Sequence, residues 1–326
     1  MRRSYLCGVL AGIAVVIAAL SVGVYVFVVR GGSLRAVPKY IAVTSVNSSH
    51  VGFINSGNSC YRNSVLQAIV RLPSMTDWYA QNYQNVSVDP VARSLAELWM
   101  NVYNISRSPI DVSNVTRSMQ DPQWQNGQSG DSQEFYSAIM NRLDGNVILN
   151  NSRYLNIARR DCNCQSSQAR SNETMLPIYF RDGLGDVDIN LTDYLAEMMR
   201  DDSSEICPRC NQQLVTRTLL NPPDILVMHF LRFHFDRATN SGRRLRNRVI
   251  FPIRGFLFNG KWFRLHALIN HQGGDRADAG HYTATVRNET GDVWFNYDDD
   301  VVSFVPEGEV ITSNAYMAFF IATGAP

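Results

Sequence analysis

Residues 52–61 of this chain read GFINSGNSCY. The glycines and asparagines of this stretch form a tight loop, and the residues after it have helical spacing up to Leu72. Cys60 is therefore predicted to lie at a helix N-terminus, where unpaired backbone N–H groups and the helix dipole favour a thiolate. A nucleophile fits this place, although a single cysteine is also often a small buried apolar residue.

A thiol nucleophile needs a base, and the base needs a third group that holds its tautomer. The predicted base is His281, which begins a strand after the Gly- and Asp-rich loop 273–279. Asp298 is the predicted third group, because it ends a strand that can pair with the one beginning at His281 through a hairpin at Thr290-Gly291. Asp299 is the alternative, and the other five histidines are expected to have no catalytic role.

The order of patterns along the chain predicts an α+β fold, with helices in the amino half and an antiparallel sheet in the carboxyl half. Helical spacing recurs over residues 91–103, and Asp131 with Glu134 resembles a capping box that opens a helix reaching Leu143. Turn signals such as Asn259-Gly260 separate some of the predicted strands. These strands are the β-branched and aromatic runs 225–233, 262–269, 281–286, 293–297 and 316–322.

Four segments of the chain resemble the ubiquitin-specific proteases, a family of papain-like deubiquitinases, and they occur in that family's order. Residues 52–67 resemble its cysteine box and residues 127–135 its second box, while residues 222–233 resemble its palm strand and residues 280–300 its histidine box. The resemblance spans residues 50–324. It implies a papain-like cysteine protease fold with a helical thumb, an antiparallel β palm and zinc-ribbon-like fingers within about 155–220.

The resemblance also implies a role for each matching residue of the site. Cys60 corresponds to the nucleophile, His281 to the general base and then acid, and Asp298 to the residue that orients the imidazole. Asn55 matches the family's oxyanion-stabilising asparagine. Its carboxamide could donate to the tetrahedral oxygen together with the backbone N–H of Cys60. The alternative for Asn55 is an amide that only closes the loop.

The second box implies two substrate-binding residues, Asp131 and Gln128. Asp131 corresponds to an acidic residue that supports binding of the ubiquitin tail, although an N-cap aspartate would look the same in the sequence. The box departs from the family pattern at two positions, because Gly130 stands where a glutamine is usual and Gln133 where a histidine is usual. Contacts to the ubiquitin tail are therefore expected to differ, and the catalytic residues are not affected.

The activity that this resemblance implies is hydrolysis of the isopeptide bond after the C-terminal Gly-Gly of ubiquitin, through a thioester on the cysteine. The implied partners are ubiquitin and ubiquitinated proteins. Two alternatives stay open: a catalytically idle ubiquitin-binding scaffold, and a protease for another ubiquitin-like modifier. The intact cysteine, histidine, aspartate and asparagine argue against the idle scaffold.

The remaining cysteines of the predicted catalytic domain form two close pairs, Cys162 with Cys164 and Cys207 with Cys210. Four thiolates in tetrahedral geometry select Zn²⁺, so the sequence predicts a structural zinc site that closes the fingers. The first pair has one spacer residue fewer than an ordinary zinc knuckle, which leaves free thiols or a disulfide as the alternative. No cofactor is expected for catalysis.

The amino end carries a predicted membrane anchor. Residues 1–4 form a short leader, and the 25 residues of 5–29 carry no charge. As a helix they would span roughly 37 Å, enough for a bilayer core of about 30 Å. A cleaved signal peptide is the alternative. Residues 30–49 form a polar tether, and the domain beyond it is expected in the cytosol, where ubiquitin conjugates and reduced thiols are found. The short leader and basic flanks resemble signal-anchored proteins of the mitochondrial outer membrane, which is favoured over the endoplasmic reticulum.

Composition sets the remaining limits. With 326 residues, 45% hydrophobic and 18% charged, the chain is an ordinary globular protein rather than a disordered or fibrous one. A net charge of +1 gives no reason to expect nucleic acid as a partner. One anomaly stands out, because only Lys39 and Lys261 among the 30 basic residues are lysines. We predict that this scarcity limits ubiquitylation of the chain, and codon usage is the alternative cause.

Overall fold

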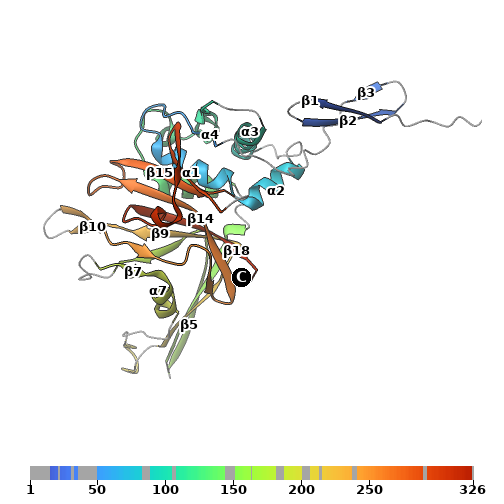
Figure 1. The fold of residues 1–326 in the computed structure, drawn as a ribbon. Coiled ribbons are helices and arrows are strands. Elements are labelled where there is room, and N and C mark those ends of the chain that lie inside the picture. The colour runs from blue at the N-terminus through green and yellow to red at the C-terminus, as the bar shows by residue number, and fades with distance from the viewer. Residues whose placement is uncertain are drawn as a thin grey trace, which may run out of the picture. The chain divides into compact units, whose positions relative to one another are not determined.

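The structure is a computed structural model, shown as a ribbon in Figure 1. It describes residues 15–20, 23–30, 33–35, 50–82, 89–104, 108–143, 151–162, 164–180, 187–199, 206–212, 215–236, 241–288 and 292–324. The chain divides into two units, residues 1–46 and residues 47–326, and each is described by itself.

The first unit contains three antiparallel strands, β1 (Val15–Leu20), β2 (Gly23–Arg30) and β3 (Ser33–Arg35). Our sequence prediction of a helix over residues 5–29 therefore differs from the structure, which has strands in the described part of that stretch. The many β-branched side chains here are the physical reason, since they lower helix propensity and favour strands. Among the described residues, no helix has both the length and the apolar surface needed to cross a membrane. The predicted leader 1–4 and most of the tether lie outside the described residues.

The amino half of the second unit is helical, as predicted. It contains α1 (Cys60–Val70), α2 (Pro73–Asn82), α3 (Pro90–Asn104), α4 (Ser113–Ser118) and α5 (Ser132–Arg142). The helices predicted from residues 60, 91 and 131 onward are confirmed as α1, α3 and α5, with bounds that differ by one or two residues. We did not predict α2 and α4, which bury few side chains and carry little periodic signal.

The carboxyl half forms an eight-stranded sheet. Its strand order is β17-β16-β15-β14-β18-β9-β6, and β13 also pairs with β14. The strands are β6 (Leu176–Tyr179), β9 (Ile225–Leu231), β13 (Phe256–Phe258), β14 (Lys261–Gln272), β15 (His281–Arg287), β16 (Trp294–Asp298), β17 (Val301–Val305) and β18 (Ala315–Thr323). The pairs are antiparallel, as predicted, except that β6 pairs parallel to β9.

The central strands are buried on both faces, which explains their continuous apolar sequences. In β9, Val227 belongs to the core shared with the helical half, and its neighbour Met228 belongs to a second core on the other face. Phe319 and Phe320 of β18 divide in the same way. Figure 1 shows α1 lying beside β15 on the helical side of this sheet and α7 (Leu191–Met198) on the other side. The sheet therefore holds α1, with Cys60 at its start, against the strand that begins at His281.

The predicted fingers form a separate three-stranded sheet in the order β5-β4-β8. Its strands are β4 (Tyr154–Cys162), β5 (Gln165–Glu173) and β8 (Val215–Asn221), all antiparallel. Two smaller pairs complete the unit: β7 (Ile189–Asn190) with β12 (Val249–Ile250), and β10 (Phe233–Asp236) with β11 (Ser241–Arg244). The described part of residues 155–220, where we predicted the fingers, thus contains most of the strands β4, β5 and β8.

Candidate active site

Cys60 is the first residue of α1, at the helix N-terminus where the sequence places it. The loop before it is closed by Asn55, whose Oδ1 accepts hydrogen bonds from the backbone N–H of Gly57 at 3.0 Å and of Ser59 at 3.2 Å. The Ser59 hydroxyl donates to the same oxygen at 3.1 Å. Gly57 and Asn58 have positive φ angles of 85° and 53°, which turn the chain sharply into the helix.

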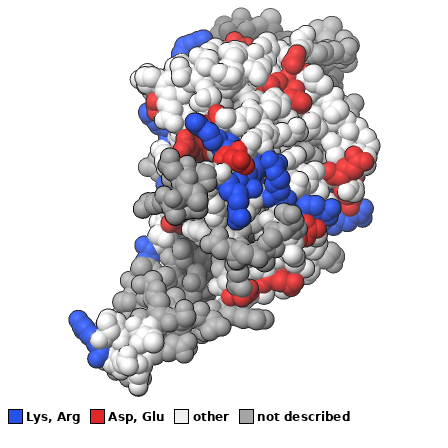
Figure 2. Space-filling model, turned by 90° about the vertical axis from the view of Figure 1, so that its left-hand side faces the viewer, with Lys and Arg blue, Asp and Glu red and all other residues white. Residues whose placement is uncertain are grey.

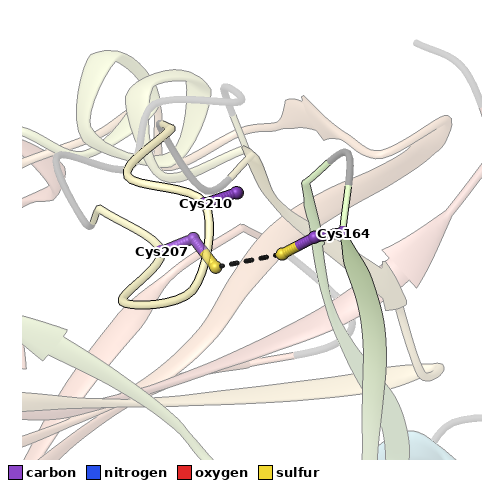
Figure 3. A group of neighbouring side chains, drawn as sticks. All are labelled: Cys164, Cys207 and Cys210. Atoms are coloured by element: carbon purple, nitrogen blue, oxygen red, sulfur yellow. Dashed lines mark hydrogen bonds between the residues drawn. The ribbon is translucent and has the colours of Figure 1, made fainter.

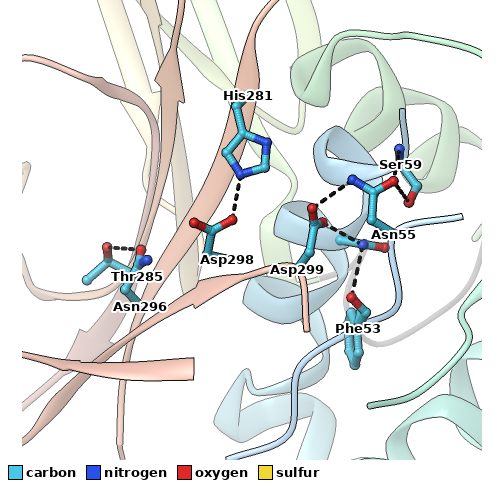
Figure 4. A network of polar contacts seen from close by, with 9 residues as sticks. Phe53, Asn55, Ser59, His281, Thr285, Asn296, Asp298 and Asp299 are labelled. Atoms are coloured by element: carbon cyan, nitrogen blue, oxygen red, sulfur yellow. Dashed lines mark hydrogen bonds and ion pairs between the residues drawn. The ribbon is translucent and has the colours of Figure 1, made fainter. Parts of the chain in front are cut away.

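His281 and Asp298 lie together on neighbouring strands. His281 begins β15, Asp298 ends β16, and the two strands pair antiparallel. The imidazole Nε2 lies 2.5 Å from Asp298 Oδ1. The two side chains are 38% and 48% exposed, so both remain accessible to a substrate. Figure 4 shows this pair beside the loop that contains Asn55. The structure therefore brings the predicted base and its predicted partner into hydrogen-bond contact.

Asp299, the alternative to Asp298, has a different place. Its Oδ2 accepts a hydrogen bond from Asn55 Nδ2 at 2.7 Å, and its Oδ1 accepts one from Asn63 Nδ2 at 2.8 Å. The backbone oxygen of Asp299 accepts from the N–H of Phe53 at 2.7 Å. A Cβ added to Gly52 would lie 2.5 Å from this backbone, so only glycine permits the close approach. Asp299 thus ties the loop before Cys60 to the β16–β17 turn (Figure 4).

The thiol of Cys60 is buried, with 8% of the residue exposed. Burial is the largest influence on its pKa and raises it, and the carboxylate of Asp299 raises it further. Hydrogen bonds from the backbone of Tyr282 and Tyr61 act in the opposite direction. Tyr282 follows His281 directly, so the sulfur lies against the start of β15. In the resting structure the raised pKa favours the neutral thiol, and a base is needed to form the thiolate.

Asp131 is the N-cap of α5, since its Oδ1 accepts from the backbone N–H of Gln133 at 2.6 Å. Its Oδ2 accepts a 2.6 Å hydrogen bond from the hydroxyl of Tyr316 on β18. The carboxylate is therefore buried and engaged at both oxygens, and burial raises its pKa. Gln128 is exposed on the loop before α5. The capping role is thus present in the structure, and the exposed amide of Gln128 is the more accessible of the two predicted substrate contacts.

The two departures in the second box have structural consequences. A Cβ at Gly130 would lie 2.9 Å from the ring of Tyr61, so a larger residue would displace that ring. Gln133 donates from Nε2 to the hydroxyl of Ser137 one turn along α5, at 2.9 Å. Gly130 therefore allows Tyr61 to pack between the two boxes, where its ring also contacts Phe135 edge-on with centroids 5.7 Å apart.

Three of the four predicted metal ligands, Cys164, Cys207 and Cys210, have sulfur atoms within 4.8 Å of one another. The Cys164 and Cys207 sulfurs are 3.6 Å apart, close to the distance of about 3.8 Å between two sulfurs bound to one tetrahedral Zn²⁺ at 2.3 Å. Figure 3 shows the side chains of Cys164 and Cys207 pointing toward one another, Cys164 from just before β5 and Cys207 from the turn 207–210, which also carries Cys210. The side chain of Cys162 lies outside the described residues. The donor set fits a structural zinc ion.

Residues 51–320 match the family described as "Ubiquitin carboxyl-terminal hydrolase". The chain belongs to this family. Among its relatives, ubiquitin carboxyl-terminal hydrolase 21 of Rattus norvegicus is 26% identical over 358 residues, which cover 84% of this chain and 62% of the relative. Ubiquitin carboxyl-terminal hydrolase 5 of Arabidopsis thaliana is 31% identical over 132 residues, or 36% of this chain and 14% of the relative.

Among solved structures, the SAGA DUB module bound to ubiquitin aldehyde contains a similar chain, with a TM-score of 0.72 and 18% identity. The match covers 88% of this chain and 72% of that one. At this identity the likeness shows the fold, which is the mixed α+β fold of the ubiquitin carboxyl-terminal hydrolase family. This chain spans between 14% and 62% of the length of the first curated relatives it matches.

Figure 2 shows a group of basic side chains near the centre of one face of this family member, with acidic side chains at several places around it. Some of the basic side chains on the described surface are paired. Arg254 contacts Glu307 at 3.0 Å, and Arg276 contacts Asp278 at 2.5 Å. Charges of both signs interspersed in this way fit the net charge of +1.

Sequence reasoning missed the contacts that hold the site together. It noted Asn63 only as part of the cysteine box and did not predict that its amide would reach Asp299. It also gave no role to Arg62, which is 1% exposed and hydrogen-bonds to two loops. The available signal was the position of both residues in the first turn of α1, where a polar side chain facing the core needs buried partners.

Proposed function

We propose that this chain is a thiol-dependent deubiquitinase that hydrolyses isopeptide or peptide bonds at the C-terminal glycine of ubiquitin. The observation that carries the proposal is the hydrogen bond between His281 and Asp298 beside the helix N-terminus of Cys60, in a chain of this family. The similar chain in the SAGA DUB module was solved in a complex with ubiquitin aldehyde, which supports the choice of substrate.

In the first step His281 accepts the proton of the Cys60 thiol, and the sulfur attacks the carbonyl carbon of the ubiquitin C-terminal glycine. Asp298 holds one ring nitrogen of His281, which leaves the other nitrogen for the proton. The protonated imidazole then gives this proton to the leaving amine of the substrate lysine. The isopeptide bond breaks, and a thioester joins ubiquitin to Cys60.

In the second step water attacks the thioester, and His281 takes a proton from the water and returns it to the Cys60 sulfur. The backbone N–H of Cys60 and the Nδ2 group of Asn55 can donate to the oxyanion in both steps. One of the two Nδ2 hydrogens of Asn55 is donated to Asp299, and this hydrogen bond fixes the orientation of the amide. The second Nδ2 hydrogen is left to donate to the substrate oxygen. Loss of one such donor costs about 3–4 kcal/mol of transition-state stabilisation in better-known hydrolases.

The main test is the Cys60→Ala variant. It should lose hydrolysis of a fluorogenic ubiquitin C-terminal amide and still bind ubiquitin, because the change removes the nucleophile and little packing. Residual activity above about one part in a thousand would identify a different nucleophile, since loss of a triad member usually costs more. Asp298→Ala is the companion variant, and it should lower kcat with little change in KM.

Two other functions remain to be separated from this one. A ubiquitin vinyl sulfone probe should label Cys60 of an active enzyme and leave an idle ubiquitin-binding scaffold unlabelled. A protease for another modifier would hydrolyse the C-terminal amide of that modifier faster than that of ubiquitin. Parallel assays with ubiquitin and ubiquitin-like amides therefore decide the substrate.

The zinc site belongs to the same proposal, with Cys162, Cys164, Cys207 and Cys210 as the four ligands. Bound zinc would supply only a structural cross-link between the end of β4 and the turn 207–210. That turn is already shaped for a ligand pair, because the N–H of Asn211 donates to the carbonyl of Cys207 at 2.9 Å and Asn211 has a positive φ of 54°.

The proposal also includes a membrane anchor in residues 5–29, with the catalytic unit in the cytosol and the mitochondrial outer membrane as the favoured site. The uncharged length of the stretch supports it. A single segment satisfies its backbone in lipid only as a helix, so insertion into a membrane would require residues 5–29 to form a helix instead of the strands β1 and β2. Resistance of the chain to alkaline extraction from membranes tests the anchor, and organelle fractionation tests the location.

The cytosolic topology has its own test. The sequons at Asn104, Asn114 and Asn190 would accept glycans in a lumenal domain. We expect no change in mass when the native protein is treated with a glycosidase. A glycosidase-sensitive shift would place the domain in the lumen and contradict the assignment.

A further inference from the structure

Arg62 is a buried cation that connects two loops of the site. It lies in the first turn of α1, two residues after Cys60, and is 1% exposed. Its Nη2 nitrogen donates to the hydroxyl of Ser56 at 2.8 Å and to Asn126 Oδ1 at 2.6 Å. Its Nη1 nitrogen donates to the carbonyl of Trp124 at 3.0 Å. One guanidinium therefore holds the loop 55–59, which precedes the nucleophile, and the loop 124–128.

The same two loops also meet directly. The N–H of Gly127 donates to the carbonyl of Gly57 at 3.1 Å, and Asn58 Nδ2 donates to the carbonyl of Gly127 at 3.2 Å. Gln128, the predicted contact for the ubiquitin tail, follows at once. The direct contacts between the loops are made by exposed residues, whereas Arg62 contacts both loops from the interior of the protein. The spacing between the loops is therefore fixed from both sides.

The chemistry of this contact indicates positioning rather than stability. The acceptors that the structure gives for Arg62 are hydroxyl, amide and carbonyl oxygens, none of them a carboxylate. Asp111 favours the charge of Arg62 through space, without a hydrogen bond to it. A buried cation of this kind is expensive to desolvate, and an apolar side chain of similar size is often as stable or more so. What an apolar side chain does not provide is a planar group with several fixed N–H directions that can bind two loops at once.

We propose that Arg62 is a positioning residue, which sets the loop 55–59 against the loop 124–128 and thereby places Asn55 and Cys60 for the tetrahedral intermediate. The inference rests on the proposed hydrolase function. It adds a residue whose buried side chain acts through the two loops that it joins.

The test compares the full-length chain with Arg62→Met and Arg62→Lys on a fluorogenic ubiquitin amide. For Arg62→Met we expect kcat to fall at least tenfold, KM to stay within about threefold, and the melting temperature to change by only a few degrees. Arg62→Lys, with one ammonium group, should restore part of kcat. An unchanged kcat in folded Arg62→Met would overturn the proposal.

A second variant keeps the inference testable if Arg62→Met does not fold. Asn126→Ala removes one acceptor of Arg62 from an exposed position and should lower kcat severalfold. Gln125→Ala is the matched control, because its Nε2 bonds only to Thr116 and Asp121 and not to the loop 55–59. Equal kcat in Asn126→Ala and Gln125→Ala would contradict the role of Arg62.

Amide hydrogen exchange separates this inference from the proposed function. Exchange in residues 55–59 and 124–128 should rise together in Arg62→Met, whether or not the chain hydrolyses ubiquitin. An inactive parent chain would refute the hydrolase proposal, and exchange unchanged in both loops would refute the role of Arg62.

Discussion

The thiol of Cys60 is subject to two opposing influences. Its place at the start of α1 and the N–H groups around it favour the thiolate, whereas burial and the nearby Asp299 carboxylate favour the thiol. Burial is the largest of these, so the pKa is raised above its ordinary value of 9.0. The resting enzyme is therefore expected to hold a neutral thiol, and its reactivity should depend on His281 as a base during the reaction.

This balance predicts how alkylation of Cys60 depends on pH. The rate with iodoacetamide, followed by mass spectrometry of the Cys60 peptide, should keep rising beyond pH 9. In Asp299→Asn the removal of a negative charge should move this curve to lower pH. A rate that is already at its plateau near pH 7 would show a preformed thiolate and contradict the expectation.

At the residue scale, local sequence was sufficient for the positions of Cys60, His281 and Asp298, because each lies at an element boundary marked by nearby glycines or by a strand pattern. It was not sufficient for Asp131, since Tyr316, which binds its second oxygen, is 185 residues away. The link between Asn63 and Asp299 spans 236 residues. Contacts of this kind depend on the packing of α1 and α5 against the sheet, which no local pattern contains.

At the element scale, β14 links the sheet to the nucleophile helix through His266. This side chain is buried, and its Nε2 lies 3.3 Å from the carbonyl of Ala68 in α1. Burial lowers the pKa of His266 to about 4, well below the ordinary value of 6.5. The unfolded chain therefore binds a proton here from about pH 6.5 downward, and the folded chain only near pH 4.

We predict that the protein loses stability as pH falls from 6.5 to about 4, because protonation of His266 then favours the unfolded state by about 1.4 kcal/mol per unit of pKa difference. His266→Gln keeps a donor for Ala68 and removes the titration. It should weaken the fall in melting temperature over this pH range while changing it little at pH 7.5. An identical pH profile for both proteins would show that His266 does not titrate in this way.

The fingers give a second prediction at this scale. Cys207→Ser should remove about one zinc ion per chain, measured by metal analysis of the purified protein, and should lower the melting temperature because the turn 207–210 loses its cross-link to β4. Cys60→Ala, which lies outside the cysteine cluster, is the control and should keep its zinc. The zinc site would be ruled out if the purified parent protein contained no zinc and had the same melting temperature after refolding with the metal and without it.

The sheet shows why some elements follow from sequence and others do not. The runs that became β9, β14 and β18 are apolar on both faces and long enough to be recognised. The turn at Asn259-Gly260 was also recognisable, since both residues take the positive φ angles, 44° and 78°, that a tight hairpin requires. The strand β6 is short, contains Pro177 and lies at an edge of the sheet, where it pairs parallel to β9. No sequence pattern in this chain predicts that pairing.

At the scale of the whole molecule, 28 of the 30 basic residues are arginines, an unusual ratio because lysine is among the commonest residues of soluble domains. Lys261 is the single lysine of the catalytic unit, and its amine is engaged. It lies 2.9 Å from Asp224 Oδ1 and donates to the carbonyls of Pro222 and Pro223 at 3.2 and 3.3 Å. Arginine keeps the positive charge but has no free amine to attack a ubiquitin thioester.

We therefore predict that lysine scarcity limits ubiquitylation of the chain by ligases near it. The experiment uses a Cys60→Ala background, which is unable to remove its own ubiquitin, and adds Arg93→Lys, Arg142→Lys and Arg209→Lys at exposed positions. Steady-state ubiquitylation should rise severalfold and the half-life should shorten, because three accessible amines replace three guanidinium groups at constant charge. Lys261→Arg is the matched control and should change neither quantity, since its amine is already bound by three oxygens. If the three added lysines leave ubiquitylation and half-life unchanged, codon usage is the better account of the composition.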